Sequence, residues 1–512
     1  MINKIKYLLL LAVLAFQFTA CNDWLSVLPE NEQVSDEYWT SKEEVESVLA
    51  SGYVYLRDAV PRLVQWGELR GGAIYSINGN DLQTFQVTPD DGSLCSWAPL
   101  YKVINMANSV IANAEVVMQR DETFDEAVMT SYLTEAYYLR ALSYFYIVRN
   151  WRDAPLILAP YETDKISYEK EKSSEAEIIA QIKEDITTAL GSGAAKEKYE
   201  EDWATKGRGT KWSLHALMAD VCLWSEDYQA AIMHCNEVLD ATSAFRPVFV
   251  TDPTKWYELF YPGNSNGSIF EINWDHGVYN QTNNLATQFG NGSPVYVYSE
   301  QMLLDWIDET DLTGSNEAVR SLYGAFVPDV NGDDYANASL GYVWKYSGIG
   351  MQAQVRNTVN EQDPNYMVYR VADVMLMKAE AMILSSSDMQ AWSVAIDLIN
   401  EVRTRAKLPV LEPVLEELNE ADMLELVLYE RNMELAGEGK RWYDLLRFGK
   451  RDGFKYRSLF LIDMVVAYNR TANPAWIRSV LNNDDALFLP IETSELENNR
   501  LLVQNPYYHA TN

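Results

Sequence analysis

The stretch VADVMLMKAEAMILSSSDMQAWSVAIDLINEV, residues 371–402, contains two apolar patterns of helical period with a polar break between them. The first stripe consists of Val371, Met375, Ala379 and Met382. The second stripe consists of Trp392, Ala395, Ile396, Ile399 and Val402. Residues spaced in this way lie on one face of a helix. The break at 385–388 is three serines and an aspartate, which favour a turn. The stretch therefore predicts a helical hairpin.

A second hairpin is predicted earlier in the chain. One apolar stripe falls within residues 213–224, the next within residues 228–239, and Glu226-Asp227 marks the turn between them. Both hairpins have alanines where the helices would cross, and both are of repeat-like length. They resemble tetratricopeptide units, which stack into a curved scaffold. A longer stripe in residues 131–149 predicts one more buried helix.

Residues 242–365 differ from the hairpins on either side of them. Asn, Gly, Pro and Asp are dense there, and helical periodicity is poor. Ile269, Phe270 and Ile272 predict a short strand, while the Asn-Gly pairs predict turns. The many aromatic residues argue against disorder. We therefore predict a mainly α fold, in which a scaffold of tetratricopeptide-like helix pairs carries a loop-rich second layer with a few short strands.

The N-terminus predicts export and lipid anchoring. An apolar run from Tyr7 to about Phe18 follows two lysines. The run is shorter than the roughly 20 apolar residues of a membrane span, and it is typical of a secretory signal. Ala20-Cys21 then resembles the end of a lipobox, where a small residue before cysteine permits cleavage. We predict that residues 1–20 are a lipoprotein signal peptide and that Cys21 carries the lipid which tethers the body of the protein.

The charge of the chain limits its possible ligands, and its cysteines allow at most one disulfide beyond Cys21. The formal net charge of −33 argues against binding nucleic acid, because phosphates would be repelled. It also disfavours sulfated or uronic-acid polymers, unless a local basic cleft overrides the overall charge. Beyond Cys21 the cysteines are Cys95, Cys222 and Cys235. Cys222 and Cys235 fall on consecutive predicted helices and could form a disulfide, but two buried free thiols are the favoured interpretation.

No motif indicates an enzyme. None of the four histidines belongs to an H-E-x-x-H pattern, and no G-x-S-x-G occurs. Asp329, Asn331 and Asp333 match the first ligands of a calcium loop, but the later glycine and glutamate are missing. We therefore predict no catalytic residue, no cofactor and no resident metal, and we leave open a weaker calcium site near Asp329.

Five segments in this order resemble the SusD/RagB family of nutrient-binding outer-membrane lipoproteins. They include CNDWL at 21–25, EAYYLRAL at 135–142, RVADVMLMKAEA at 370–381, EGKRWYDL at 438–445 and QNPYY at 504–508. The resemblance implies a surface-exposed lipoprotein of the outer membrane, attached to the membrane only through its lipid. It also implies a role as a hinged lid on a SusC-like TonB-dependent transporter.

The resemblance further implies a single SusD-like domain from residue 21 to residue 512. Its predicted parts are a helical scaffold at about 36–60, 98–240 and 366–450, a loop-rich ligand face at about 61–97 and 242–365, and a C-terminal segment at 451–512.

The charged residues of the fourth segment are predicted to hold the fold rather than a ligand. Glu430 and Glu434 are one helical turn apart, and Arg441 and Arg447 can return to them. A partly buried charge network of this kind would keep the C-terminal helices in register. The predicted structural set is Glu430, Arg431, Glu434, Glu438, Arg441, Trp442 and Asp444.

The resemblance places the ligand on the variable loops. In similar proteins a sugar stacks on a tryptophan at the position of Trp97, just before a helix that contains Tyr101 and Asn105. An aromatic ring covers the apolar face of a sugar, while polar side chains bind its hydroxyls. The candidate ligand-binding residues are Trp97, Trp66, Arg70, Tyr75, Asn78, Asp81, Trp274, Tyr279, Tyr296 and Trp344.

Four functional hypotheses follow from these patterns. The leading one is a cell-surface lipoprotein that captures oligosaccharides or polysaccharide and delivers them to a SusC-like transporter. The RagB branch of the family implies an alternative, the binding of peptides or small metabolites. The helical repeats would also suit an adaptor that docks other proteins. A hydrolase without a recognisable motif is the weakest alternative.

The lipid anchor leads to a direct prediction. We expect Cys21→Ala to release the protein from the membrane in a folded state, because the acyl chain is the only apolar anchor that the sequence predicts. Membrane fractionation and circular dichroism of the released protein would measure both properties. Tight membrane association of the variant with no partner present would contradict the predicted anchor.

Overall fold

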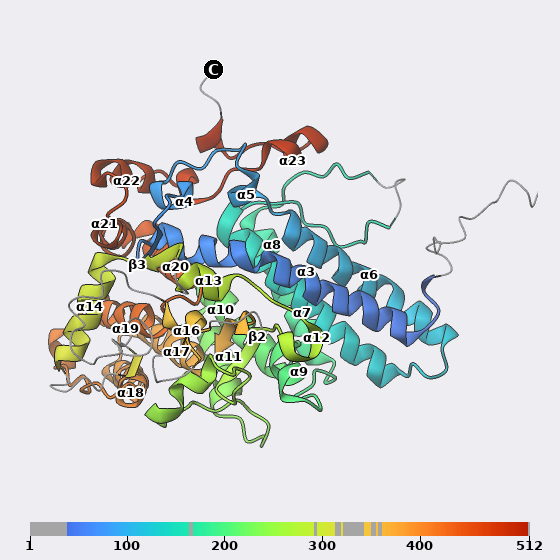
Figure 1. Cartoon of the computed structure of the whole chain (residues 1–512), viewed down its shortest axis with the longest axis horizontal. Helices are drawn as coiled ribbons and strands as arrows, with labels where there is room; N and C mark the ends of the chain where they lie inside the picture. The colour runs from blue at the N-terminus through green and yellow to red at the C-terminus, as the bar shows by residue number, and fades with distance from the viewer. Residues whose placement is uncertain are drawn as a thin grey trace, which may run out of the picture.

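The computed structural model describes residues 38–162, 167–290, 294–312, 319–320, 343–349, 355–356 and 361–509. Cys21, the predicted signal peptide and the candidate calcium loop near Asp329 lie outside these residues. Helices dominate the described part (Figure 1), which confirms the predicted mainly α class.

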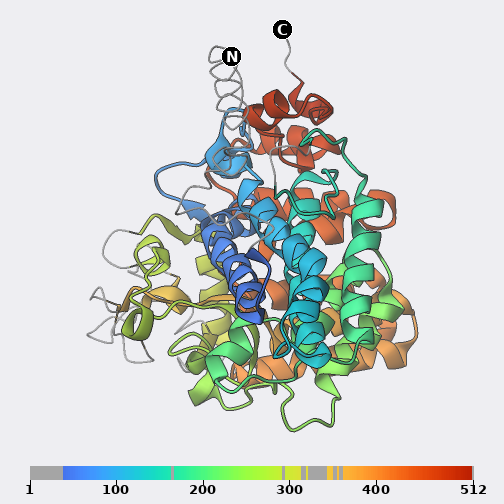
Figure 2. The same ribbon diagram turned by 90° about the vertical axis from the view of Figure 1, so that its right-hand side faces the viewer.

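Long helices of the N-terminal half form the first part of the scaffold. They are α3 (Lys42–Glu68), α6 (Ala98–Arg120), α7 (Glu126–Trp151), α8 (Glu175–Gly191), α10 (Lys211–Trp224) and α11 (Tyr228–Leu239). Neighbours in the chain pack on one another, α3 on α6, α6 on α7, α7 on α8 and α10 on α11. Figure 2 looks onto this layer, with α3 and α6 side by side.

Local capping explains where these helices begin. The backbone N–H of Ser41 donates to the carboxylate of Glu44 at 2.9 Å, which satisfies a group that the first turn of α3 leaves without a partner. Asp125 caps α7 by accepting the N–H of Val128 at 2.8 Å. The scaffold segment that we predicted to end near residue 60 continues as α3 through Pro61 to Glu68.

The two predicted hairpins are present and stack on each other. The second hairpin consists of α17 (Val371–Ser385) and α18 (Met389–Arg405), and α11 of the first hairpin packs against α17. Ala379 and Ala395 are completely buried between the helices. Cys222 and Cys235 are buried free thiols, as is Cys95. The cysteines of the first hairpin therefore act as small apolar side chains.

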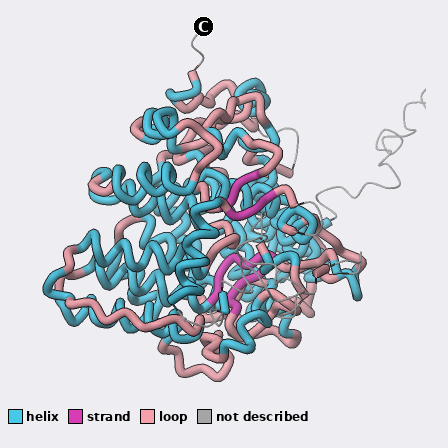
Figure 3. Tube along the Cα trace, turned by 60° about the vertical axis from the view of Figure 1, so that its left-hand side comes forward, coloured by secondary structure: helices cyan, strands magenta, loops and turns pink. Residues whose placement is uncertain are grey.

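The loop-rich layer contains two short antiparallel strand pairs, drawn in magenta in Figure 3. Strand β1 (Ile74–Ser76) pairs with β3 (Tyr296–Tyr298), and β2 (Ser268–Ile272), which includes the predicted strand residues, pairs with β4 (Tyr366–Arg370). The short helices between and beside them are α4 (Asp81–Thr84), α5 (Gly92–Cys95), α9 (Asp202–Gly207), α12 (His276–Tyr279), α13 (Leu285–Phe289) and α16 (Trp344–Ser347).

One longer helix of this layer, α14 (Glu300–Leu312), was not predicted. Met302 and Trp306, four residues apart on the same face, are both completely buried in the main core. This short apolar stripe indicates a helix. We missed it because the sequence on either side is rich in residues that favour turns.

The C-terminal part of the chain packs against elements of the N-terminal half. Its elements are α19 (Glu420–Glu434), α20 (Arg441–Phe454), a π-helix (Arg457–Ile462), α21 (Asp463–Tyr468), α22 (Pro474–Leu481) and α23 (Thr493–Asn498). The N–H of Leu489 donates to the carbonyl of Asn150 at 2.7 Å, and the N–H of Thr493 donates to the carbonyl of Pro89 at 2.9 Å. These bonds place α23 beside the beginning of α6, where the candidate site lies.

A buried network of ion pairs joins the two halves of the scaffold. Arg370, the last residue of β4, donates to Glu434 at 2.7 Å and to Glu438 at 2.8 Å. Lys345 of α16 contacts Glu438 at 2.6 Å. Burial alone would raise the pKa of Glu434, but Arg405, Arg370 and Arg320 hold this pKa well below its ordinary value. The carboxylates are therefore ionised inside the core.

The predicted residues do form a network, but two of the predicted pairs were wrong. Arg447 binds Glu380 at 2.7 Å and Asp444 at 2.9 Å, and Arg441 lies 5.0 Å from the ring centre of Tyr468. Neither arginine reaches Glu430 or Glu434. Those glutamates lie on the face of α19 that contacts β4 and α18, whereas α20 packs on the face that presents Arg431.

The network predicts a large stability effect at its centre. We expect Arg370→Met to lower the free energy of unfolding by about 3–5 kcal/mol, because it leaves two buried carboxylates short of a cation. Arg478→Ala is the matched control. Its pair with Asp463 is half exposed on both sides, so it should cost about 0.5 kcal/mol or less. Urea unfolding would measure the free energy of unfolding of both variants. An equal loss of stability in the two variants would contradict the importance of the network.

Candidate functional site

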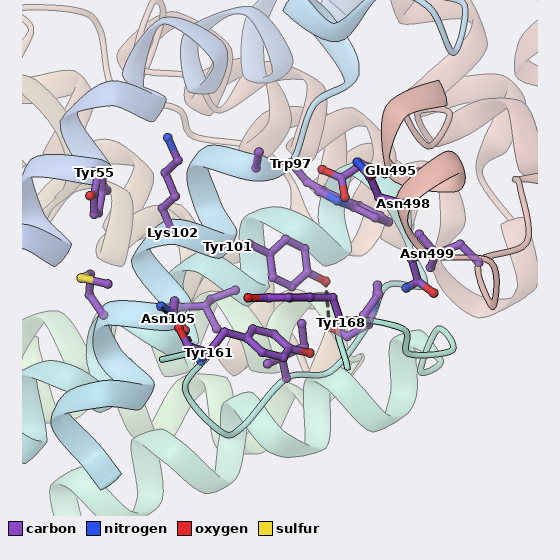
Figure 4. A pocket seen from close by; sticks show the side chains of 16 residues that line it. Tyr55, Trp97, Tyr101, Lys102, Asn105, Tyr161, Tyr168, Glu495, Asn498 and Asn499 are labelled. Atoms are coloured by element: carbon purple, nitrogen blue, oxygen red, sulfur yellow. Dashed lines mark hydrogen bonds between the residues drawn. The ribbon is translucent and has the colours of Figure 1, made fainter. Parts of the chain in front are cut away.

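A pocket of about 580 Å³ opens where four segments meet, as Figure 4 shows. Its sides come from α3, the beginning of α6, residues 155–161 with Tyr168, and the region around α23. The described residues that line it are Tyr55, Trp97, Ala98, Tyr101, Lys102, Ile104, Asn105, Met106, Pro155, Ile157, Tyr161, Tyr168, Glu495, Asn498, Asn499 and Leu502.

Aromatic rings form much of the pocket wall. The rings of Tyr161 and Tyr168 have their centres 4.8 Å apart and are tilted by 38°. Tyr168 is 52% exposed, so a face of its ring is available to a ligand. On the opposite side, the ammonium group of Lys102 lies 5.6 Å from the ring centre of half-buried Tyr55. A flat, partly apolar ligand would therefore find aromatic surface on two sides.

Side chains of α6 and α7 hold the loop that carries Tyr161. Asn105 accepts the backbone N–H of Tyr161 at 2.8 Å. The hydroxyl of Tyr144 accepts the N–H of Ile157 at 2.6 Å and donates to the carbonyl of the same residue at 2.8 Å. Tyr101 donates to the carbonyl of Pro155 at 2.7 Å. This side of the pocket is therefore built in advance of any ligand.

The C-terminal segment completes the rim with polar groups. Burial raises the pKa of Glu495, and a hydrogen bond with Trp97 partly offsets that rise. Asn499 donates to the carbonyl of Lys170 at 2.8 Å and so fixes the segment after Tyr168. Glu495 and exposed Asn498 offer hydrogen-bonding groups at the edge of the aromatic wall.

The chemistry of this lining suits binding. Glu495 is the only carboxylic acid among the described residues of the pocket, whereas glycoside hydrolysis ordinarily takes a pair of carboxyl groups. In the part of the chain that the structure describes, no group of three or more His, Cys, Asp and Glu side chains is placed to hold a metal ion. Aromatic faces beside a few polar groups instead match the make-up of small-ligand sites.

Trp97, the leading candidate from the sequence, lies in this pocket but shows little of its ring. It is 3% exposed, and its ring centre is 5.6 Å from that of Tyr101 and 5.7 Å from that of Trp151. Trp97 therefore supports the wall and positions Glu495. The rings with more surface open to a ligand are Tyr161 and Tyr168.

Four other candidates are interior residues, which corrects the expectation that they contact a ligand. Trp66 is completely buried and donates from its indole to the carbonyl of Leu94 at 2.6 Å. Arg70 is buried over the ring of Trp442, at 4.4 Å. Tyr296 is buried on β3, and Trp344 is completely buried in a second, smaller core. The loop-rich layer needs its own apolar core, and these side chains supply part of it.

The remaining candidates lie on the surface, away from the lining of the pocket. Tyr75 is half-buried on β1, and Asn78 and Asp81 are exposed in and after the turn that follows it. Trp274 is half-buried, and its backbone N–H donates to the side chain of Asn365 at 3.2 Å. Tyr279 is 55% exposed and borders a different groove. The predicted ligand residues thus do not form one site.

Several pocket residues were missed from the sequence. Tyr55 and Lys102 fall on long amphipathic helices, where an aromatic or a lysine carries no special signal. Tyr161 and Tyr168 follow Pro155 and Pro160 in a stretch without periodicity. Aromatic residues in a stretch without helical periodicity were the signal by which we chose candidates in other loops. The same signal could have identified Tyr161 and Tyr168.

Comparison with known proteins identifies the family. The family model described as "SusD family" matches residues 286–508, and the model described as "Starch-binding associating with outer membrane" matches residues 23–223. Together the two models cover most of the chain. The protein therefore belongs to the SusD-like family.

Relatives and solved structures agree with this assignment. SusD-like protein P38 of Formosa agariphila is 27% identical in an alignment of 504 residues, which covers 91% of this chain and 94% of that protein. A SusD superfamily protein from Bacteroides vulgatus has the same fold, with a TM-score of 0.72 at 21% identity, covering 92% of this chain and 99% of that one. A laminarin-binding SusD-like protein superposes with a TM-score of 0.67 at 21% identity, covering 92% and 100%.

Proposed function

We propose that the protein is a cell-surface lipoprotein that binds glycans and passes them to a SusC-like TonB-dependent transporter. The observation that carries the proposal is the pocket at the beginning of α6, where Tyr161 and Tyr168 offer ring surface beside Lys102, Glu495 and Asn498. A sugar has an apolar face and a polar edge, and this lining complements both.

The family supports a carbohydrate as the ligand. One matching family model is described as starch-binding, and one structure of the same fold is described as laminarin-binding. Both descriptions concern polymers of neutral sugars, which a strongly acidic protein does not repel. The pocket is open, and it offers aromatic faces and hydroxyl partners rather than a deep enclosure. We therefore expect an affinity in the micromolar range or weaker, about −8 kcal/mol or less favourable.

Two observations support a location at the outer membrane. The N-terminal sequence ends its apolar run at Cys21, and the family model that matches residues 23–223 is described as associating with the outer membrane. None of the described helices is both long enough and apolar enough to cross a bilayer. Lipid on Cys21 would supply the attachment. The short polar lead from Asn22 to Ser35 would then let the body of the protein pivot.

The role as a lid rests on the stiffness of the body. The hairpins stack through buried side chains, and the ion network joins β4, α16, α18 and α19 inside the core. A body of this kind moves as one piece when it hinges. Closure over a barrel would add a second wall to an open pocket and would raise retention of the glycan. Opening would then expose the glycan again.

Glycan binding in the pocket can be tested directly. We expect the double variant Tyr161→Ala, Tyr168→Ala to bind its glycan about ten-fold more weakly, a loss of about 1.4 kcal/mol, because stacking surface is removed. Affinity gels with a polysaccharide panel, followed by calorimetry, would measure the loss. Phe245→Ala is the control, since Phe245 is 51% exposed outside the pocket. Unchanged binding by the double variant would exclude the pocket, and binding of peptides alone would favour the RagB-type alternative.

The partner is tested on native membranes. We expect the untagged protein to copurify in mild detergent with a SusC-like barrel, and we expect glycan uptake to fall when the lipoprotein gene is deleted. The physical reason is that an open, weak site retains its ligand only when the barrel closes it. Recovery as a free monomer, together with normal uptake after the deletion, would refute the lid role.

A further inference from the structure

A second groove lies on a different face of α3 from the pocket described above. It has a volume of about 330 Å³ and is bordered by α3, α9, β2 and α12. Its α3 residues include Glu46, Ala50, Tyr53 and Arg57, which recur at helical spacing on one face. Tyr55, which lines the first pocket, points from another side of the same helix. The two cavities are therefore separate.

Exposed apolar side chains gather at this groove. Trp203 of α9 is 46% exposed and Tyr279 of α12 is 55% exposed, and their ring centres are 6.3 Å apart at an angle of 67°. Val54 and Val278, next to groove residues in the chain, are 48% and 72% exposed. Figure 1 shows α9 and α12 close together beside α3. Two exposed aromatic rings in contact at the edge of a groove offer apolar surface to a ligand.

One cation in the groove is not held by a hydrogen bond or an ion pair from the residues that the structure describes. Arg57 is half-buried, and among the described residues it forms no hydrogen bond and no ion pair. Burial lowers the pKa of its guanidinium, and the charge of the neighbouring, exposed Asp58 partly offsets this. The other arginine, Arg208, is held by Glu135 through two contacts of 2.8 and 2.9 Å. The groove therefore has two guanidinium groups, of which only one is matched by a carboxylate from the protein.

The acid in the lining is remote from Arg57. Glu46 lies eleven residues earlier on α3, which corresponds to about 17 Å along the helix axis. The lining is thus electrostatically uneven, with the guanidinium of Arg57 at one end and the exposed carboxylate of Glu46 at the other. Asp58, which acts on Arg57 from the next position in the chain, lies outside the lining and forms no ion pair with it. A ligand with one carboxylate would bind in a single orientation, with its acid at Arg57.

We propose that this groove is a second glycan-binding site, selective for a sugar that carries a carboxylate, such as a uronic acid. The sugar ring would stack on the exposed ring of Trp203 or Tyr279, and the carboxylate would form a two-pronged hydrogen bond with Arg57. The proposal rests on the glycan-binding function proposed above. The net charge of −33 repels anions at long range, but a half-buried guanidinium acts at contact distance, where screening by water is weaker.

Matched pairs of sugars test the proposal. Cellobiouronic acid would be compared with cellobiose, and digalacturonic acid with galactobiose, by calorimetry and by quenching of tryptophan fluorescence. We expect the acidic member of at least one pair to bind the full-length mature protein about ten-fold more tightly than its neutral counterpart. Added salt should reduce this preference, because an ion pair contributes to it.

Variants locate the binding. Arg57→Gln should abolish the preference for the acid, and Trp203→Ala should weaken binding of the acidic sugar about ten-fold. Tyr168→Ala, in the first pocket, should leave binding of the acidic sugar in the groove in place. Phe245→Ala, at a side chain that is 51% exposed outside both cavities, is the control and should leave the preference unchanged. Thermal unfolding would check that each variant is folded. Arg57→Gln breaks no ion pair, so its midpoint should stay within about 2 °C of the unchanged protein.

The outcomes distinguish this proposal from the proposed function. If no acidic sugar is preferred, the second site is refuted while glycan binding in the first pocket stands. If acidic sugars are preferred but only Tyr168→Ala removes their binding, the first pocket binds them and the groove is again refuted. If neither the four disaccharides nor any polysaccharide of the panel binds, the glycan-binding function itself fails.

Discussion

The need to pair buried charges constrains the fold more than any other interaction. Glu430, Glu434 and Glu438 are almost completely buried, and an unpaired carboxylate in such surroundings costs several kcal/mol. Their partners come from distant parts of the chain: Arg320 and Lys345 from the loop-rich layer, Arg370 from the end of β4, and Arg403 and Arg405 from α18. The native arrangement is the one that brings all of these groups together. Stacking of the hairpins and attachment of the loop layer are therefore coupled.

The functional surfaces depend on this rigid body without being part of its charge network. The first pocket uses the beginning of α6 as a base, and the chain returns through α23 to bring Glu495 and Asn499 against it. The second groove uses another face of α3, opposite α9 and α12. One long helix, α3, thus borders both cavities and keeps the distance between them constant. If both cavities bind glycans as proposed, a fixed distance would suit the capture of an extended polymer.

Burial explains why the predicted ligand residues and the observed cavities differ. Trp66 and Trp97 both fall in the region predicted as loops, but Trp66 lies on helix α3 and is wholly enclosed, whereas Trp97, 3% exposed, precedes α6 and borders a pocket. Trp344 and Tyr279 differ in the same way within the second loop region. A loop layer buries some of its aromatic side chains to stabilise itself and exposes others. Composition and spacing do not distinguish the two groups, because irregular backbone has no fixed period that relates position to face.

The sequence by itself determined the helical class, the hairpins at residues 213–239 and 371–402, the strand around Phe270 and the charged set around Glu430 and Asp444. Each of these features depends on the spacing of apolar residues or on a short sequence motif. Interactions between residues that are close in the chain determine both. Only the tertiary structure decided which carboxylate pairs with which arginine, and that Tyr161 and Tyr168 lie side by side in the pocket that α23 borders. It also decided that Arg57 forms no ion pair among the described residues. These relations join residues that are far apart in the chain or on irregular loops. They arise only when the packed helices bring such residues to the same place, because no local pattern encodes the distance between them.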